Sequence, residues 1–316
     1  MKNLTSICKF KEGTQIQGFY LCVEKHLRYT KAGDLFIDLE LRDITGHITA
    51  KIWENVHELN IKFENGNAVV ISGYVEAYLD HLQLVVKKIN KATVQHYGRY
   101  GFDPANIVPT SKKDPLKMWK NILLTINEIK NKELQRLILL IYKADKKKIL
   151  IHPASVKSSY NFRSGFLEHV LTMTQLVKKI TPHYRVDKEL VMAGVLLIKI
   201  GVLNGIKSGY VNDYSKEGNL IGQSVIAKDM MNNAVKKIKK FPLELKIKLE
   251  HIILSHENNY QSVNSYRPSF PEALLVHLIH RFDTNMTLME QTINDDSELN
   301  DFTSKRNYFG LPIFKK

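Results

Sequence analysis

The spacing of apolar side chains changes once along the chain, and this change limits the fold more than any other feature of the sequence. Up to about residue 93, apolar residues recur at every second position in short runs, which is the repeat of strands with one buried face. From Pro115 onward they recur every three or four positions, which is the repeat of amphipathic helices. The sequence therefore predicts a multidomain β + α protein, with a small β domain followed by a larger helical domain.

The β domain is predicted to contain several short strands separated by turns. Turn signals lie at Asp43–Gly46 and around Leu79–His81. The strands are expected at Gln15–Val23, Leu35–Leu41, Ile48–Trp53, Ala68–Tyr74 and Leu82–Ile89. So many strands in about 80 residues, without a long helix between them, favour a small closed barrel.

The net charge of +14, with a pI near 9.5, favours polyanionic partners. Residues 1–100 contain 13 Lys and Arg against 11 Asp and Glu, and the remainder contains 33 against 21. The excess therefore lies in the helical half, in runs such as Lys146–Lys148 and Lys236–Lys240. Two interpretations stay open: a polyanion-binding surface, or lysines on solvated helix faces.

Two features bear on the compartment of the protein. The longest apolar stretch, Leu190–Ile198, is far shorter than the roughly 20 residues of a membrane span, and the N-terminus lacks the apolar core of a secretory signal. The only cysteines, Cys8 and Cys22, make neither a disulfide framework nor a thiolate metal site. We expect a cytoplasmic protein without a membrane partner.

The segment from Gly18 to Trp53 carries a motif around its second predicted strand. Residues 30–46, TKAGDLFIDLELRDITG, follow a basic loop, and Trp53 closes the segment. The segment resembles the OB-fold of replication proteins and certain exonucleases, which implies a five-stranded OB-fold barrel. Such barrels bind single-stranded RNA or DNA by stacking bases on aromatic rings while cations follow the phosphates.

The resemblance makes aromatic and basic residues of the barrel candidates for nucleic-acid binding. Phe36 is expected to point outward, because it alternates with the apolar face of its strand. Each aromatic residue has a competing interpretation as filling of the barrel core, and the nearly neutral charge of the domain predicts modest, salt-sensitive affinity. The aromatic candidates are Phe19, Phe36, Trp53, Tyr74 and Tyr78, and the basic candidates are Lys25, Arg28, Lys31, Lys51 and Lys87.

The sequence predicts four segments. Residues 1–96 form the OB-fold nucleic-acid-binding domain, residues 97–144 a linker with connecting helices, residues 145–299 the helical domain, and residues 300–316 a C-terminal tail. The tail mixes aromatic, aliphatic and basic residues, a composition suited to contact with a partner or with the chain's own helical domain.

Several landmarks of the helical domain occur in a recognisable order. They are FRSGFLEHVLTM at 162–173, AGVLLIKIGVL at 193–203, YSKEGNLIGQS at 214–224, HIILSHE at 251–257 and PEALLVHLIHRFDTNM at 271–286. Their order and spacing resemble the HD superfamily of metal-dependent phosphohydrolases, and within it the YhaM-type 3′→5′ exoribonucleases, which also place an OB-fold before the HD domain. The resemblance covers nearly the whole chain and implies an all-α HD-type domain.

The residues that would bind metal depart from the family pattern. His169 and His256 match it, and Asp283 matches a second family aspartate. The defining His-Asp doublet is replaced by Ile198-Lys199, a paired histidine by Ser159-Tyr160, another histidine by Gln223, and the final ligand aspartate by His280. Because isoleucine cannot bind metal and a lysine cation opposes a dication, we expect no metal and no metal-dependent hydrolysis.

Two alternatives for this region stay open. A rebuilt site would bind Mn²⁺ or another divalent ion through His169, His256, His280 and Asp283, with Glu257 and His277 nearby. Lys199, for its part, would either hold a phosphate, assisted by Lys207, Arg163 or Arg281, or turn outward to solvent.

The leading hypothesis is a protein that binds single-stranded nucleic acid, RNA in particular, and whose HD-type domain is a pseudoenzyme scaffold. The first alternative is an active metal-dependent 3′→5′ exoribonuclease with a rebuilt site. The second is a structural subunit of a nucleic-acid-containing complex, which meets protein partners through the basic helical domain and the tail.

Overall fold

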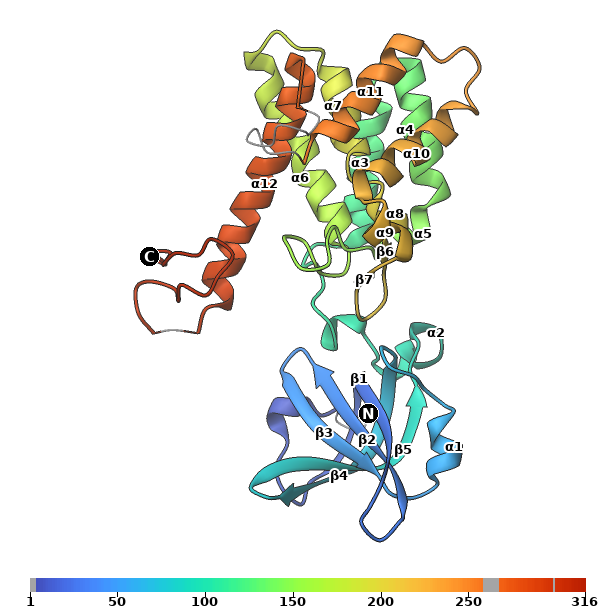
Figure 1. The fold of residues 1–316 in the computed structure, drawn as a ribbon, viewed down its shortest axis with the longest axis vertical. Helices are drawn as coiled ribbons and strands as arrows, with labels where there is room; N and C mark the ends of the chain where they lie inside the picture. The colour runs from blue at the N-terminus through green and yellow to red at the C-terminus, as the bar shows by residue number, and fades with distance from the viewer. Residues whose placement is uncertain (1–3, 258–266, 298) are drawn as a thin grey trace. The chain divides into compact units, whose positions relative to one another are not determined.

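The computed structural model describes residues 4–257, 267–297 and 299–316. The chain divides into two compact units, which are described separately below. The first comprises Met1–Thr110 with Gly209–Val211, and the second comprises Ser111–Ser208 with Asn212–Lys316 (Figure 1).

The first unit is a closed five-stranded barrel, as predicted. Its strands are β1 (Gln15–Tyr29), β2 (Leu35–Asp43), β3 (Gly46–Ile52), β4 (Ala68–Tyr78) and β5 (His81–Lys91). They pair in the order β1-β2-β3-β5-β4, and only β3 and β5 run parallel. The short helix α1 (Val56–Asn60) lies between β3 and β4 in sequence. This is the topology of an OB-fold, a Greek-key barrel.

The barrel core and its turns follow from the alternation of side chains. Ile37, Leu39 and Leu41 point into the core and are almost completely buried. At the β2–β3 turn, the buried carboxylate of Asp43 accepts hydrogen bonds from the backbone N–H groups of Ile7, Thr45 and Gly46. Because one side chain satisfies several otherwise unpaired donors, this turn is firmly defined.

The segment predicted as a linker, residues 97–144, is divided between the two units. After α2 (Val94–Tyr97), the side chains of Phe102, Ile107 and Val108 are buried against the barrel surface. The helices from Pro115 onward pack into the second unit. Apolar residues without helical or strand periodicity here cover one side of the barrel, so the segment is not a free linker.

The second unit is helical apart from one short strand pair, β6 (Ile206–Lys207) with β7 (Asp213–Tyr214). Its helices are α3 (Pro115–Asn127), α4 (Lys132–Ala144), α5 (Lys146–Ile149), α6 (Gly165–Ile180), α7 (Lys188–Leu197), α8 (Val202–Gly205), α9 (Lys216–Leu220), α10 (Gln223–Val235), α11 (Leu243–Ser255) and α12 (Pro271–Asp295). Helix α7 lies at the centre of the unit, with every residue from Leu190 to Leu197 buried, and contacts α4, α6, α11 and α12.

The C-terminal tail folds back beside the end of α12 (Figure 1). Phe302 and Phe314 form a β-bridge, and Lys315 forms an ion pair of 2.9 Å with Asp296. The tail was expected to contact either a partner or the chain's own helical domain, and the structure contains the second of these contacts. None of the described helices is long and apolar enough to span a membrane.

Candidate nucleic-acid interface and helical pocket

An aromatic pair lies on the outer face of the barrel, where β2 and β3 run side by side. The rings of Phe36 and Trp53 stack with their centroids 4.8 Å apart and an interplanar angle of 28°. The ammonium of Lys51 lies 4.8 Å from the centroid of the Phe36 ring and 5.9 Å from that of Trp53. Stacked rings beside a cation match the two needs of a single strand, a base platform and a phosphate partner.

Phe36 is on the outer face, as predicted, but its ring is not the accessible one. Trp53 and Lys51 cover it, and only 8% of its surface is exposed, against 42% for Trp53. Trp53 is therefore the ring that a base can reach, while Phe36 supports it from behind.

The basic candidates around this pair are all held by carboxylates. Arg28 and Lys51 share Asp38, at 3.0 and 3.4 Å, and Lys87 contacts Glu54 at 2.6 Å. The hydrogen bond to Glu54 raises the pKa of Lys87. The pair of Lys87 with Glu54 is exposed and contributes little stability, so a phosphate can replace Glu54 at small cost. The side chains of Lys51 and Asp38 are each only 20% exposed, whereas that of Arg28 is 57% exposed. We call the set Arg28, Phe36, Asp38, Lys51, Trp53, Glu54 and Lys87 the Trp53 face.

The next row of the barrel surface is acidic. Glu24 pairs in register with Glu40, Glu40 with Thr49, Thr49 with Gln83, and Gln83 with Glu76. These carboxylates, of which Glu24 contacts His26 at 3.2 Å and Glu40 contacts His47 at 3.0 Å, oppose the approach of phosphates. A bound strand is therefore expected to stay on the side of the barrel that carries Trp53.

Four of the remaining candidates, Lys25, Phe19, Lys31 and Tyr78, do not join the Trp53 face. Lys25 donates to the backbone carbonyls of Asn60 and Phe63, at 2.6 and 2.7 Å, so its ammonium fixes the end of α1. Three others lie away from the Phe36–Trp53 pair. Phe19 packs against Phe102, Lys31 is exposed in the β1–β2 loop, and Tyr78 is exposed at the β4–β5 hairpin. Tyr74, half-buried on β4, lies opposite Val85, which is itself opposite Lys51.

In the helical unit, a cavity of about 400 Å³ gathers most of the predicted site residues. His169 from α6 and His280 from α12 line it, together with Lys199, Gln223 and Glu257. His256 and Asp283 are buried beside it, whereas Ile198 packs into the apolar core. Lys207, Arg163 and Arg281, suggested as assisting cations, are not among the described residues that line the cavity.

A hydrogen-bonded chain crosses the floor of this cavity. Nδ1 of His169 donates to Asp283 at 2.6 Å, and Nδ1 of His280 donates to Nε2 of His169 at 3.2 Å. The hydroxyl of Tyr160 donates to the other oxygen of Asp283 at 3.0 Å. Burial lowers the pKa of His169, and burial with the nearby charges of His256 and Lys199 lowers the pKa of His280 well below its usual range.

Lys199 points into the cavity and does not turn out to solvent. Only 8% of its surface is exposed, and its ammonium donates to Glu257 at 3.0 Å and to Gln223 at 3.4 Å. The positive charge of Lys199 holds the pKa of the Glu257 carboxyl well below its usual range. The cavity therefore contains a tethered cation with its own counter-ion.

A metal ion fits this residue set poorly. Ligand atoms of His256, Glu257 and His280 lie within 4.8 Å of one another, and Nε2 of His256, 3.5 Å from Glu257, has no hydrogen-bond partner in the part of the chain that the structure describes. However, the carboxylate they share is already bound to Lys199, whose charge opposes a dication. Of the ligand set suggested for a rebuilt site, His169 and Asp283 are bonded to each other.

The lowered pKa values predict that acid destabilises the helical unit. The unfolded chain binds protons on its histidines below about pH 6.5, whereas buried His169, His280 and His152 resist them. Stability is therefore full above about pH 6.5 and falls below it, by at most about 1.4 kcal/mol per histidine for each pH unit. Urea unfolding followed by circular dichroism at 222 nm should show a lower midpoint at pH 5.5 than at pH 7.5.

Two variants test whether the buried histidines cause this pH dependence. His280→Asn should reduce the pH dependence, while His183→Asn, at an exposed position after α6, should leave it unchanged. Equal midpoints at both pH values in the unmodified protein would contradict the assignment of neutral buried histidines.

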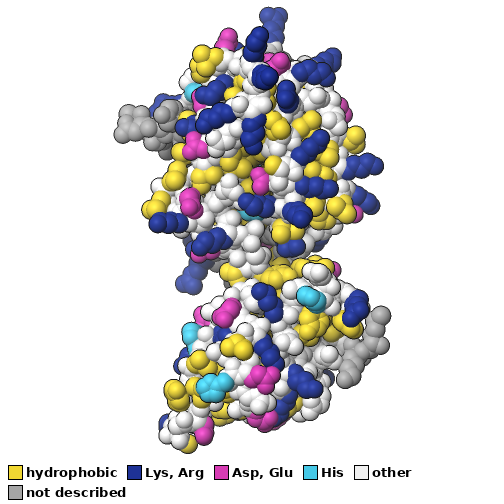
Figure 2. All heavy atoms as spheres, turned by 90° about the vertical axis from the view of Figure 1, so that its right-hand side faces the viewer, with side chains coloured by type: hydrophobic (Ala, Val, Ile, Leu, Met, Phe, Trp, Pro, Cys, Tyr) yellow, Lys and Arg dark blue, Asp and Glu magenta, His cyan; other side chains and the backbone are white. Residues whose placement is uncertain are grey.

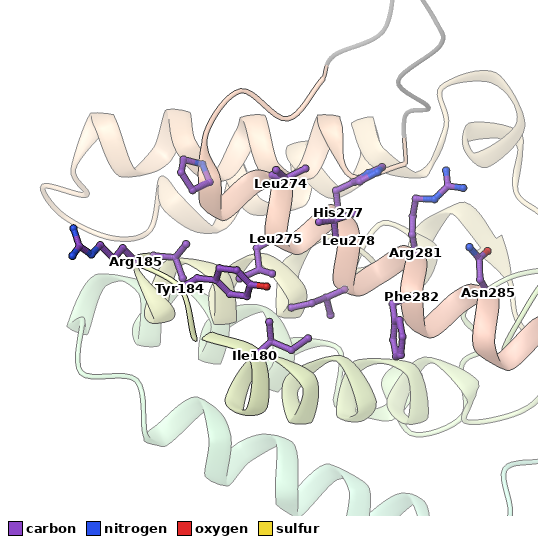
Figure 3. Close-up of a pocket in the computed structure, with 13 residues that line it drawn as sticks. Ile180, Tyr184, Arg185, Leu274, Leu275, His277, Leu278, Arg281, Phe282 and Asn285 are labelled. Atoms are coloured by element: carbon purple, nitrogen blue, oxygen red, sulfur yellow. The ribbon is translucent and has the colours of Figure 1, made fainter. Parts of the chain in front are cut away.

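A mainly apolar groove of about 1020 Å³ lies between α12 and the end of α6. In Figure 3, Leu278 and Phe282 of α12 line it opposite Ile180 and Tyr184. His277, which was grouped with the metal candidates, lies in this groove, and its Nδ1 donates to the carbonyl of His256 at 2.8 Å. Arg185 and Arg281 also line the groove, beside its mainly apolar side chains.

The positive charge of the helical unit is dispersed on the face seen in Figure 2. Lys and Arg side chains alternate there with apolar and acidic ones, and do not gather in one patch. On that face, the arrangement is the one expected of lysines on solvated helices.

Comparison with known proteins supports the barrel assignment. The OB-fold nucleic acid binding domain family (tRNA_anti-codon) matches residues 24–92. With the closed topology described above, this match defines the first unit as an OB-fold nucleic-acid-binding domain. The helical unit lies outside the match.

Solved structures similar to this chain include OB-folds of replication proteins. The second OB-fold domain of replication protein A from Methanococcus maripaludis is 20% identical and covers 28% of this chain and 94% of its own, with a TM-score of 0.25. The replication factor A related protein from Methanobacterium thermoautotrophicum is 17% identical and covers 29% and 92%, with a TM-score of 0.26. A replication protein A heterotrimer bound to ssDNA is 15% identical and covers 28% and 63%, with a TM-score of 0.23. At these TM-scores the structures add no argument of their own.

Proposed function

We propose that this protein binds single-stranded nucleic acid, RNA in particular, through the Trp53 face of its OB-fold barrel. The observation that carries the proposal is the stack of Phe36 and Trp53 with the Lys51 ammonium over it. A base can stack on Trp53 because that ring is partly exposed. Of the cations beside it, Arg28 and Lys87 are partly exposed and are paired with Asp38 and Glu54.

We further propose that the helical unit is a scaffold related to the YhaM-type HD domains and does not carry out metal-dependent hydrolysis. Two observations support this. Ile198 lies in the apolar core where the family has a ligand, and Lys199 takes the carboxylate of Glu257 that a metal would need.

Binding of matched oligonucleotides tests the proposal. Fluorescence anisotropy with a labelled single-stranded RNA, the same sequence as DNA, and the RNA duplex should show preference for the single strands. With about three phosphates contacted, the logarithm of the affinity should fall with the logarithm of salt with a slope of about −2. Equal affinity for the duplex, or no binding at low salt, would contradict the proposal.

An active exonuclease remains the second candidate function, because of one observation. Nε2 of His256 is buried, has no hydrogen-bond partner among the described residues, and lies 3.5 Å from Glu257; with His280 these groups are at distances that a metal ion can bridge. This candidate requires Lys199 to leave Glu257 when a metal binds.

A further inference from the structure

A groove on the barrel unit shares no residue with the Trp53 face. It has a volume of about 930 Å³ and lies over the first half of β1, the start of β4 and the end of β5. The segment after β5, which contains α2, forms its other wall. We call it the Tyr97 groove; it is lined by Leu4, Gln17, Phe19, Lys62, Val70, Asn90, Lys91, His96, Tyr97, Arg99 and Tyr100.

Aromatic rings form a connected series in this groove. The ring centroids of Phe19 and Tyr97 are 6.0 Å apart, and those of Tyr97 and Tyr100 are 6.2 Å apart. The guanidinium of Arg99 lies 4.8 Å from the centroid of the Tyr100 ring, and that ring is 59% exposed. An exposed ring backed by a guanidinium is a platform on which a base can stack.

The charge of the groove differs from that of the Trp53 face. No carboxylate is found among the described residues that line it, whereas each cation of the Trp53 face has an acidic partner. Lys62 is paired with Glu58, but the described part of the chain contains no ion pair between a carboxylate and Lys91 or Arg99. Phosphates can therefore approach Lys91 and Arg99 without displacing an acid.

From the rings and the unpaired cations together, we propose that the Tyr97 groove is a second binding site for single-stranded nucleic acid. One or two bases stack on Tyr100 and its neighbours, and Lys91 and Arg99 bind the adjoining phosphates. The proposal rests on the proposed function, since it extends the path of the same strand over another side of the barrel. A strand long enough to reach both sites gains affinity from each.

The test uses the full chain and a labelled poly(U) RNA of about 30 nucleotides. Replacement of both cations, Lys91→Gln with Arg99→Gln, should reduce the salt slope by about 1.4 and weaken binding about tenfold at low salt. Tyr100→Ala should weaken binding about tenfold. The matched controls are Lys88→Gln, an exposed position on β5 outside the groove, and Tyr29→Ala, an exposed tyrosine on β1; both should stay within about twofold of the unmodified protein.

The outcomes separate this inference from the proposed function. If Trp53→Ala weakens binding but the groove variants behave like their controls, the second site is refuted and the Trp53 face stands. If the groove variants weaken binding and Trp53→Ala does not, the groove is supported and the Trp53 face is refuted. If the unmodified protein does not bind the RNA, both proposals fail.

Discussion

Trp53→Ala should weaken the binding of single-stranded RNA by about 10- to 100-fold, because one stacked base contributes about 1–3 kcal/mol. The effect should lie toward the upper end of that range. Trp53 both offers the accessible ring and covers Phe36, whose ring the substitution would expose to water beside Lys51. Anisotropy titrations of the full chain at a fixed salt concentration measure the change.

A conservative variant and a distant one control this experiment. Trp53→Phe keeps a ring for stacking and should lose less than tenfold. Ile44→Ala removes a similarly exposed apolar side chain at the β2–β3 turn and should leave affinity unchanged. If Trp53→Ala binds as tightly as Ile44→Ala, the Trp53 face is not the binding surface.

Lys199→Met should allow Zn²⁺ to bind in the cavity that Lys199 lines at least about 100-fold more tightly than in the unmodified protein. Two unit charges about 5 Å apart interact by about 3 kcal/mol at an effective dielectric constant of about 20, and a divalent ion feels twice that repulsion. The substitution also releases the carboxylate of Glu257. Two imidazoles and a carboxylate are a ligand set that suits zinc.

Zinc titration against a competing chelator measures this change without any need for activity. Lys216→Met, an exposed lysine on α9 that does not line the cavity, is the matched control. Adding His280→Ala to Lys199→Met should abolish the gain. If the unmodified protein binds Zn²⁺ as tightly as Lys199→Met, Lys199 does not oppose the metal and the scaffold proposal loses its electrostatic basis.

The strands could be predicted from alternation, but not their full length. Beyond Val23, β1 continues to Tyr29 through side chains that are mostly exposed, so no apolar repeat marks it. Its pairing with β2 through backbone hydrogen bonds maintains the strand there. Alternation detects a strand only where one face is buried.

For the candidate nucleic-acid interface, the sequence predicts which residue types take part but not which side chains contact one another. That Lys25 would bind the carbonyls of Asn60 and Phe63, and that Trp53 would cover Phe36, depends on side-chain packing across several strands. The Tyr97 groove was missed for a different reason. Its signal, the aromatic and basic run from His96 to Tyr100, lies in a segment interpreted as a linker.

In the cavity of the helical unit, the set of lining residues was easier to foresee than the direction of one side chain. His169, Lys199, Gln223 and His280, which the family resemblance assigned to one site, line one cavity, and each lies near the end or on the inner face of a packed helix. The sequence left the direction of Lys199 open. The acceptors that hold the ammonium inward, Glu257 just beyond α11 and Gln223 at the start of α10, come together only in the fold.

The most direct measurement follows a single-stranded RNA, labelled at its 5′ end and with a free 3′ end, in the presence of the protein and Mn²⁺. Binding of the same RNA without metal is measured in parallel by anisotropy. The proposed function predicts that the RNA is bound, that Trp53→Ala weakens this binding, and that the RNA keeps its full length with Mn²⁺ present. Metal-dependent shortening from the 3′ end that is lost in His280→Ala would contradict it and would identify the helical pocket as an active site.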